Sequence, residues 1–167
     1  MTARILVAYA SRKGSTAGIA QAVGKELETT GARVDVVELG KISTLAGYDA
    51  VVAGVPVYIG KVEKDISKFV AQHHDWLAKV PVAAFAVGIA PVAPRVEPAE
   101  KVQEDLRKAL SPIKPVALTV FAGKLDPEKM SFIERKMTGL MNVRTGDFRD
   151  WNAIAAWARE LPEKLGL

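Results

Sequence analysis

The sequence predicts an α/β fold built on a parallel sheet. Apolar runs of strand length alternate with amphipathic helical patterns along all 167 residues. Some of these runs are continuously apolar, as strands are when helices cover both faces of a sheet. The length suits one domain with a substantial core, so we expect a single domain over residues 1–167.

Five short apolar runs are the predicted strands. They cover residues 5–9, 34–38, 50–55, 82–87 and 116–122. The second run mixes polar and apolar residues, which is typical of a strand at the edge of a sheet. The third is apolar throughout, so we expect it to be buried on both faces.

Five helices are predicted from apolar residues that recur every three or four positions. In the first, which Ser15 or Thr16 opens, Ile19, Val23 and Leu27 recur at this spacing and Gly31 marks the end. The predicted helices cover residues 15–30, 63–79, 98–110, 127–141 and 151–165. The fourth is an additional helix in the loop after the fifth strand. We expect the three tryptophans, Trp76, Trp151 and Trp157, to be core anchors, and His73 and His74 to cap the end of the second helix.

Composition narrows the classes of function. Hydrophobic residues make up 49% and charged residues 25% of the chain, as in ordinary globular proteins. The net charge is +4, but lysines and arginines are interleaved with acidic residues, so we expect no nucleic-acid partner. No apolar run approaches the ~20 residues of a membrane span, and residues 1–8 do not resemble a signal peptide, so a cytoplasmic location is expected. Without cysteine, a redox role needs an external cofactor.

A candidate phosphate site follows the first predicted strand. The loop runs Ser11, Arg12, Lys13, Gly14, Ser15, Thr16 and leads directly into a helix. Hydroxyl groups and backbone amides at a helix N-terminus hold a phosphate well, because the helix dipole favours negative charge there. The spacing fits neither a P-loop nor a dinucleotide-binding turn. The alternative is an ordinary helix cap, for which one Ser or Thr suffices.

The loops after the third, fourth and fifth strands reach the same edge of the sheet, where parallel sheets bind ligands. Residues 56–61, read as an exposed loop, offer the Tyr58 ring for stacking and flexible peptides near Gly60. The backbone amides of residues 88–91 could contact the polar rim of a ring, and residues 122–125 could close the other side. A packed Tyr58 and a plain glycine turn at Gly88 are the alternatives.

These loops resemble those of flavodoxins, and the resemblance covers the whole chain. It implies a three-layer sandwich with a five-stranded parallel sheet of order 2-1-3-4-5, and one FMN bound where the strand order reverses. It also implies which residues contact the cofactor. The expected FMN-binding residues are Ser11, Arg12, Lys13, Gly14, Ser15, Thr16, Pro56, Val57, Tyr58, Ile59, Gly60, Gly88, Ile89, Ala90 and Pro91. No catalytic side chain and no metal ligand is assigned.

A narrower resemblance points to the menaquinone-dependent protoporphyrinogen oxidase branch of the flavodoxin superfamily. It rests on residues 120–125, on the following helix, which contains Met and Arg, and on Asp150-Trp151. Members of that branch are basic and carry an inserted helical segment, here about residues 126–149. Apolar residues lie along this segment, namely Met130, Phe132, Met137 and Met141, and Lys124, Arg135 and Lys136 could meet the carboxylates of a porphyrin. Packing against the core or a solvated helix face would explain the same residues.

Two functions follow from this resemblance. The first is an FMN-dependent oxidoreductase that acts on protoporphyrinogen or a similar bulky substrate, with a quinone or another small molecule as its partner. The second is a flavodoxin-type electron carrier with a redox partner protein. Peripheral contact with a membrane and association into homo-oligomers stay open. A non-flavin binding domain of the same fold is the third alternative, and it would leave the three loops unexplained.

Overall fold

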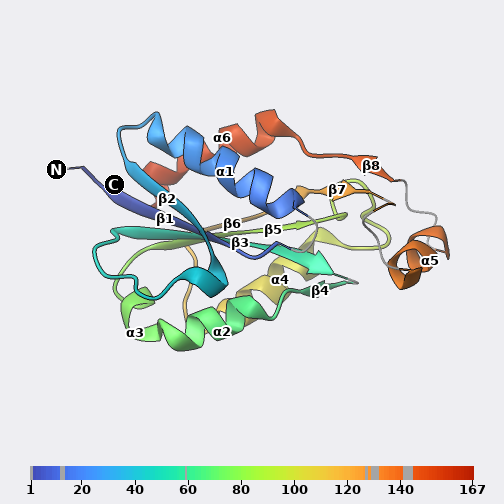
Figure 1. The fold of residues 1–167 in the computed structure, drawn as a ribbon, viewed down its shortest axis with the longest axis horizontal. Helices are drawn as coiled ribbons and strands as arrows, with labels where there is room; N and C mark the ends of the chain where they lie inside the picture. The colour runs from blue at the N-terminus through green and yellow to red at the C-terminus, as the bar shows by residue number, and fades with distance from the viewer. Residues whose placement is uncertain (1, 12–13, 59, 127, 129–131, 141–144) are drawn as a thin grey trace.

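Five parallel strands form the central sheet in the order β2-β1-β3-β5-β6 (Figure 1). The strands are β1 (Arg4–Tyr9), β2 (Arg33–Glu38), β3 (Ala50–Tyr58), β5 (Val82–Gly88) and β6 (Ala117–Ala122). The computed structural model describes residues 2–11, 14–58, 60–126, 128, 132–140 and 145–167. With the short strand β4 left out of the count, the order is the predicted 2-1-3-4-5, and β2 is the expected edge strand.

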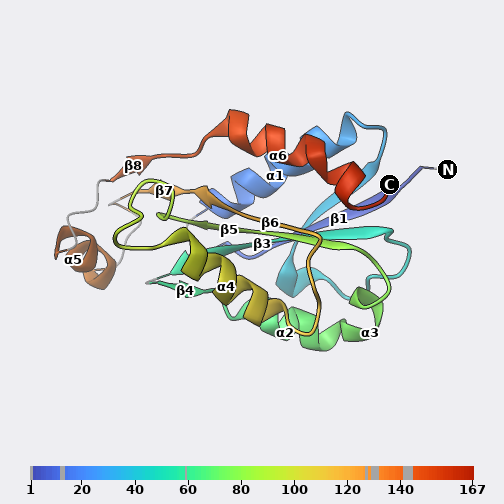
Figure 2. The same cartoon turned by 180° about the vertical axis from the view of Figure 1, so that it is seen from behind.

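Helices cover both faces of this sheet, as Figures 1 and 2 show. One face carries α1 (Ser15–Glu28) and α6 (Trp151–Lys164); the other carries α2 (Asp65–Gln72), α3 (His74–Leu77) and α4 (Ala99–Leu110). A 3-10 turn, η1 (Leu39–Lys41), follows β2. Two hydrophobic cores result, one on each side of the sheet. Alternate residues of each central strand enter opposite cores.

Local chemistry fixes where the two helices on the α1 face begin. Gly14 precedes α1 with φ 86°, a left-handed conformation that glycine adopts without steric cost. Asp150 precedes α6, and its carboxylate accepts the backbone N–H of Ala153 at 3.0 Å, a side-chain cap. The predicted strands and these two helices are confirmed to within a few residues.

The predicted helix over residues 63–79 is wrong as one continuous element. It breaks at His73, whose φ of −117° and ψ of 20° are not helical, and α3 restarts at His74. The His73 ring lies against Phe69, with ring centroids 5.0 Å apart. His73 therefore follows the end of α2 as expected, but His74 begins the next helix. Ile66, Phe69 and Trp76 all face the same core, so the periodic pattern does not reveal the break.

The predicted loop over residues 56–61 is also wrong. Strand β3 continues to Tyr58 and folds back onto β4 (Lys61–Val62), with Val57 paired to Val62 and Tyr58 to Lys61. Gly60 lies at the turn with φ 72°, the left-handed conformation that tight hairpin turns require. Pro56, Val57 and Tyr58 are therefore held on a strand.

A second hairpin follows β6. Strands β7 (Lys124–Leu125) and β8 (Gly146–Asp147) pair in antiparallel fashion, and α5 (Phe132–Leu140) lies between them in the sequence. Figures 1 and 2 place α5 at the end of the molecule opposite the two termini. The additional helix is thus confirmed over 132–140. Its predicted residues 127, 129–131 and 141 lie outside the described part of the chain.

The three tryptophans differ in how they pack against the core. Trp157 packs edge-on against Phe85 and Phe121, with ring centroids 5.9 and 5.6 Å away. Trp76 lies partly buried against the other core. Trp151 is 46% exposed, so its prediction as a core anchor is wrong, because it opens α6 at the surface. Among the helices described, none has the length and apolar character needed to cross a membrane.

Candidate functional site

A cleft lies at the carboxyl ends of β1, β3, β5 and β6. It brings together residues from the loops that the sequence singled out. Its lining residues are Ser15, Thr16, Pro56, Val57, Tyr58, Val87, Gly88, Ile89, Gly123, Lys124 and Leu125. The enclosed part has a volume of about 90 Å³. Because β1 and β3 are neighbours while β2 lies beyond β1, this is the point where strand order reverses.

The N-terminus of α1 forms one end of the cleft. Ser11 Oγ accepts the N–H of Gly14, the residue before the helix, at 3.1 Å. No side chain of the described residues caps α1, so N–H groups of its first turn remain available to a ligand. Ser15 is partly exposed, whereas Thr16 lines the cleft but is only 1% exposed.

Gly123 lines the cleft just after the end of β6. It donates its N–H to the Gly88 carbonyl at 3.0 Å and accepts the N–H of Phe148 at 3.1 Å. A methyl group added at Gly123 would lie 2.8 Å from Val87 Cγ1 and 3.3 Å from Ser15 Oγ. The end of β6 thus approaches the start of α1 closely. A side chain larger than that of glycine would crowd Val87 and Ser15 at this position. Gly123, Lys124 and Leu125 close the side of the cleft as expected.

The loop after β5 differs from expectation. The N–H groups of Ile89 and Ala90 both donate to Glu97 Oε1, at 3.0 and 3.1 Å. Glu97 is 8% exposed; burial raises the pKa of this carboxyl, while the two backbone hydrogen bonds lower it. These two amides are therefore directed at a carboxylate of the chain, and contact of this loop with a ligand stays a prediction.

The predicted site residues divide into three groups. Ser15, Thr16, Pro56, Val57, Tyr58, Gly88 and Ile89 line the cleft. Ser11, Gly14, Gly60, Ala90 and Pro91 belong to its loops without lining it. Arg12, Lys13 and Ile59 lie outside the described residues.

Comparison with known sequences supports the same assignment. A sequence model described as a flavodoxin domain matches residues 6–152. The chain belongs to the flavodoxin domain family. A curated relative, protoporphyrinogen IX dehydrogenase [quinone] of Leishmania major, is 27% identical over 178 residues, covering 94% of this chain and 74% of the relative.

Solved structures agree on the fold. Flavodoxin 2 of Bacillus cereus matches with a TM-score of 0.60 at 20% identity, covering 97% of this chain and 99% of that structure. A flavodoxin from the domain Archaea matches with a TM-score of 0.57 at 18% identity, covering 98% and 99%. These identities establish the flavodoxin fold and no finer similarity.

A charged group that the sequence analysis missed borders the cleft of this flavodoxin-domain protein. Arg149 donates Nε and Nη2 to the Asp147 carboxylate at 2.9 and 2.7 Å, and its guanidinium lies 4.8 Å from the centre of the Trp151 ring. These bonds lower the pKa of Asp147 to about 2, and Lys124 adds to the effect. A methyl group at Gly18 would lie 2.9 Å from Arg149 Nη1. The Asp-x-Arg spacing, which puts both side chains on one side of an extended chain, is the signal that could have revealed the pair.

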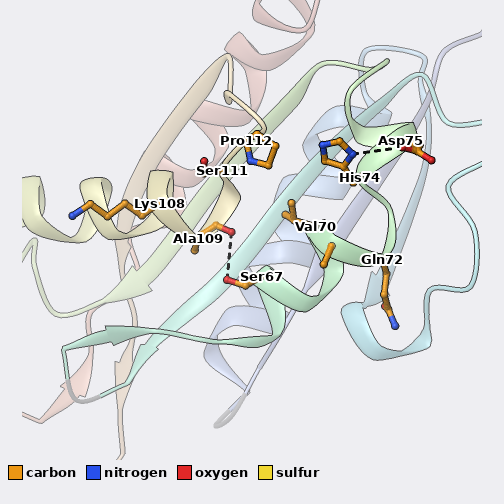
Figure 3. Close-up of a pocket in the computed structure, with 10 residues that line it drawn as sticks. Ser67, Val70, Gln72, His74, Asp75, Lys108, Ala109, Ser111 and Pro112 are labelled. Atoms are coloured by element: carbon orange, nitrogen blue, oxygen red, sulfur yellow. Dashed lines mark hydrogen bonds and ion pairs between the residues drawn. The ribbon is translucent and has the colours of Figure 1, made fainter.

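A larger hollow of this flavodoxin-domain protein lies elsewhere. It has a volume of about 550 Å³ and lies between the C-terminal ends of α2 and α4, at the amino ends of the strands (Figure 3). Ser67 Oγ donates to the Ala109 carbonyl across it at 3.4 Å, and His74 lies 3.5 Å from Asp75. It is open, and no residue predicted to bind a cofactor lines it. We therefore assign the site to the smaller cleft.

Within the described residues, no three His, Asp or Glu side chains are grouped to hold a metal.

Proposed function

We propose that this chain is a single FMN-binding domain that acts as an oxidoreductase, with the cofactor in the cleft at the carboxyl ends of the strands. The observation that carries the proposal is the convergence of three separate loops on that cleft. Ser15, Tyr58 and Gly88 follow or end three different strands, yet all line one hollow. Membership of the flavodoxin domain family supports the same choice of cofactor.

The chain's residues fit a phosphate at one end of the cleft and a flat ring at the other. The uncapped first turn of α1 and the Ser15 hydroxyl would hold the phosphate. Tyr58 on β3, which lines the cleft together with Gly88 and Ile89, would contact the ring. The enclosed volume of about 90 Å³ is below the ~300–1,000 Å³ usual for ligand pockets. An isoalloxazine ring would therefore stay partly exposed at the rim, beside the β3–β4 hairpin.

The chain's own contribution is position and electrostatics. A bound FMN would supply electron and hydride transfer. Tyr58 and Lys124 are the titratable side chains that line the cleft. The Lys124 ammonium would favour negative charge on a ligand near the β7–β8 hairpin, and Gly88 and Ile89 would exclude water from one side of the ring.

The favoured substrate is a bulky reduced compound such as a protoporphyrinogen, with a quinone as acceptor. The relative from Leishmania major, whose name states that activity, supports this choice. Helix α5 supports it as well: Phe132 and Leu140 are each 77% exposed, and Arg135 and Lys136 lie exposed on the same helix. Such a helix could cover an apolar ring that carries carboxylates. A flavodoxin-type electron carrier is the second candidate, favoured by the similarity to solved flavodoxins over nearly the whole chain.

Titration with FMN and with riboflavin tests the cofactor. Ser15→Ala should weaken FMN binding about tenfold, because a hydrogen bond to a charged group contributes roughly 1.5–3 kcal/mol. Riboflavin, which lacks the phosphate, should bind both proteins equally. Ser67→Ala, the same change in the distant hollow, is the matched control and should leave both affinities unchanged. Equal affinity of the wild-type protein for FMN and riboflavin would overturn the phosphate site.

A turnover assay distinguishes the oxidoreductase from the electron carrier. The FMN-loaded protein is assayed with protoporphyrinogen and a quinone, beside a test of its reduction by a flavodoxin reductase. The enzyme proposal predicts quinone-dependent oxidation of the porphyrinogen. Reduction by the reductase without any porphyrinogen oxidation would favour the carrier.

A further inference from the structure

Glu97 is a buried carboxylate directly behind the wall of the cleft. Its Oε1 accepts the N–H groups of Ile89 and Ala90, and its side chain is 8% exposed. A methyl group added at Gly88 would collide with the same Oε1 and would lie 3.1 Å from Val57 Cβ. Gly88, Ile89 and Val57 all line the cleft, so the carboxylate lies against residues that form its wall.

Burial raises the pKa of Glu97, and three neighbouring groups act against that shift by stabilising the ionised form. Two N–H groups donate to one oxygen, and Lys101 on α4 adds an attractive charge. The Lys101 ammonium is bonded to Asp105 at 2.8 Å, so it acts on Glu97 only through space. Tyr58 and Lys124 are the titratable groups among the described residues that line the same cleft as Gly88 and Ile89.

We propose that Glu97 is a positioning residue with two effects on the cleft. It fixes residues 88–90 as a wall whose amides point away from the ligand, and its charge makes the cleft bind an oxidised, neutral ring more tightly than a reduced, anionic one. The first effect follows from the two hydrogen bonds. The second follows because a like charge held close in a poorly solvated wall disfavours an anion. The second effect rests on the proposed FMN binding, and the first does not.

Glu97→Gln tests both effects, because glutamine keeps a carbonyl oxygen for the two N–H groups and removes the charge. The matched control is Glu104→Gln, the same change at an exposed position of α4. In the ligand-free proteins we expect the Ile89 and Ala90 amides to exchange with solvent about tenfold faster in Glu97→Gln, since bonds to a charged acceptor are stronger. In the FMN-loaded proteins we expect the ratio of reduced to oxidised FMN affinity to rise about tenfold, which is about +30 mV for a two-electron couple. The control should change neither quantity.

Each outcome decides part of the proposal. An unchanged reduction potential in Glu97→Gln, with FMN bound, overturns the charge effect. Unchanged exchange at Ile89 and Ala90 overturns the positioning effect. A residue that only supports the fold would lower the melting temperature and leave the potential unchanged. If the wild-type protein binds no FMN, the proposed function fails together with the charge effect, and amide exchange still decides the positioning effect.

Discussion

At the scale of single residues, two sets of contacts near the cleft come from polar side chains that the sequence does not single out. Glu97 lies between Pro94 and Pro98 in a segment that looks like an ordinary surface loop, yet it is buried and holds two amides. Asp147 and Arg149 each look like surface charges, yet they form a two-point ion pair beside the cleft. Hydrophobic periodicity shows where apolar residues recur, so it does not reveal hydrogen bonds and ion pairs that polar side chains make.

The Asp147–Arg149 pair predicts a specific pH dependence of stability. The folded-state pKa of Asp147, about 2, lies below its ordinary value of 3.8. The pair therefore contributes fully above about pH 4, and its contribution is lost as the pH falls toward 2. We expect Asp147→Asn to melt at a lower temperature than the wild-type protein at pH 7, with the difference closing by about pH 2.

The pH-dependent gap in melting temperature is modest, because the Asp147 side chain is 41% exposed and solvent screens the pair. Glu160→Gln removes one partner of the exposed Lys164 pair, where N and O are 3.3 Å apart, and is the control for losing a surface charge. A gap between wild type and Asp147→Asn that is as large at pH 2 as at pH 7 would contradict the assignment of the pair.

At the scale of elements, periodicity predicts the long, strongly patterned segments and misses the short ones. The central strands and α1, α4 and α6 follow from apolar spacing because their buried faces run for several turns or residues. The two hairpins, β3–β4 and β7–β8, pair only two residues on each strand, too few for a period to show. They form nonetheless, because each continues from or lies against an element that is already fixed.

On helix α6, the sequence pattern does not distinguish a tryptophan that packs against the core from one at the surface. Two tryptophans on this helix allow a matched test. The sequence treats Trp151 and Trp157 alike, but only Trp157 contacts Phe85 and Phe121. Trp157→Ala should lower the free energy of unfolding by about 2–4 kcal/mol, less than a fully buried tryptophan because Trp157 is partly exposed. Trp151→Ala, the same change on the same helix, should lower it by at most about 1 kcal/mol through the lost contact with Arg149. Urea denaturation measures the free energy of unfolding of both variants. Equal decreases would show that the contacts of Trp157 with Phe85 and Phe121 do not stabilise the packing of α6.

At the scale of the whole molecule, the two ends of the sheet differ in character. The chain termini lie at one end of the molecule and α5 lies at the other (Figure 2). The larger hollow is lined by residues at the amino ends of the strands, and the cleft lies at their carboxyl ends. The sequence locates this division because the carboxyl ends of parallel strands meet at one edge. It does not reveal that α5 extends away from the sheet with Phe132 and Leu140 exposed, since an apolar residue in a helical pattern is expected to face a core. Whether this exposed helix covers a substrate therefore distinguishes the oxidoreductase from the electron carrier.

The β7–β8 hairpin allows that helix to be removed cleanly. Leu125 pairs with Gly146, so residues 126–145 can be replaced by Asn-Gly, a two-residue turn that suits antiparallel strands. Asp147, Arg149 and every residue that lines the cleft remain, so we expect FMN affinity to change less than twofold. If α5 covers a bulky substrate, porphyrinogen oxidation should fall at least a hundredfold while reduction of small acceptors by the bound FMN is kept. Arg135→Gln with Lys136→Gln on the intact chain should raise the KM for a carboxylate-bearing porphyrinogen and spare kcat, because these cations would bind the substrate and take no part in the chemistry. A truncated protein that keeps its FMN and its full porphyrinogen-oxidising activity would rule out this role for α5.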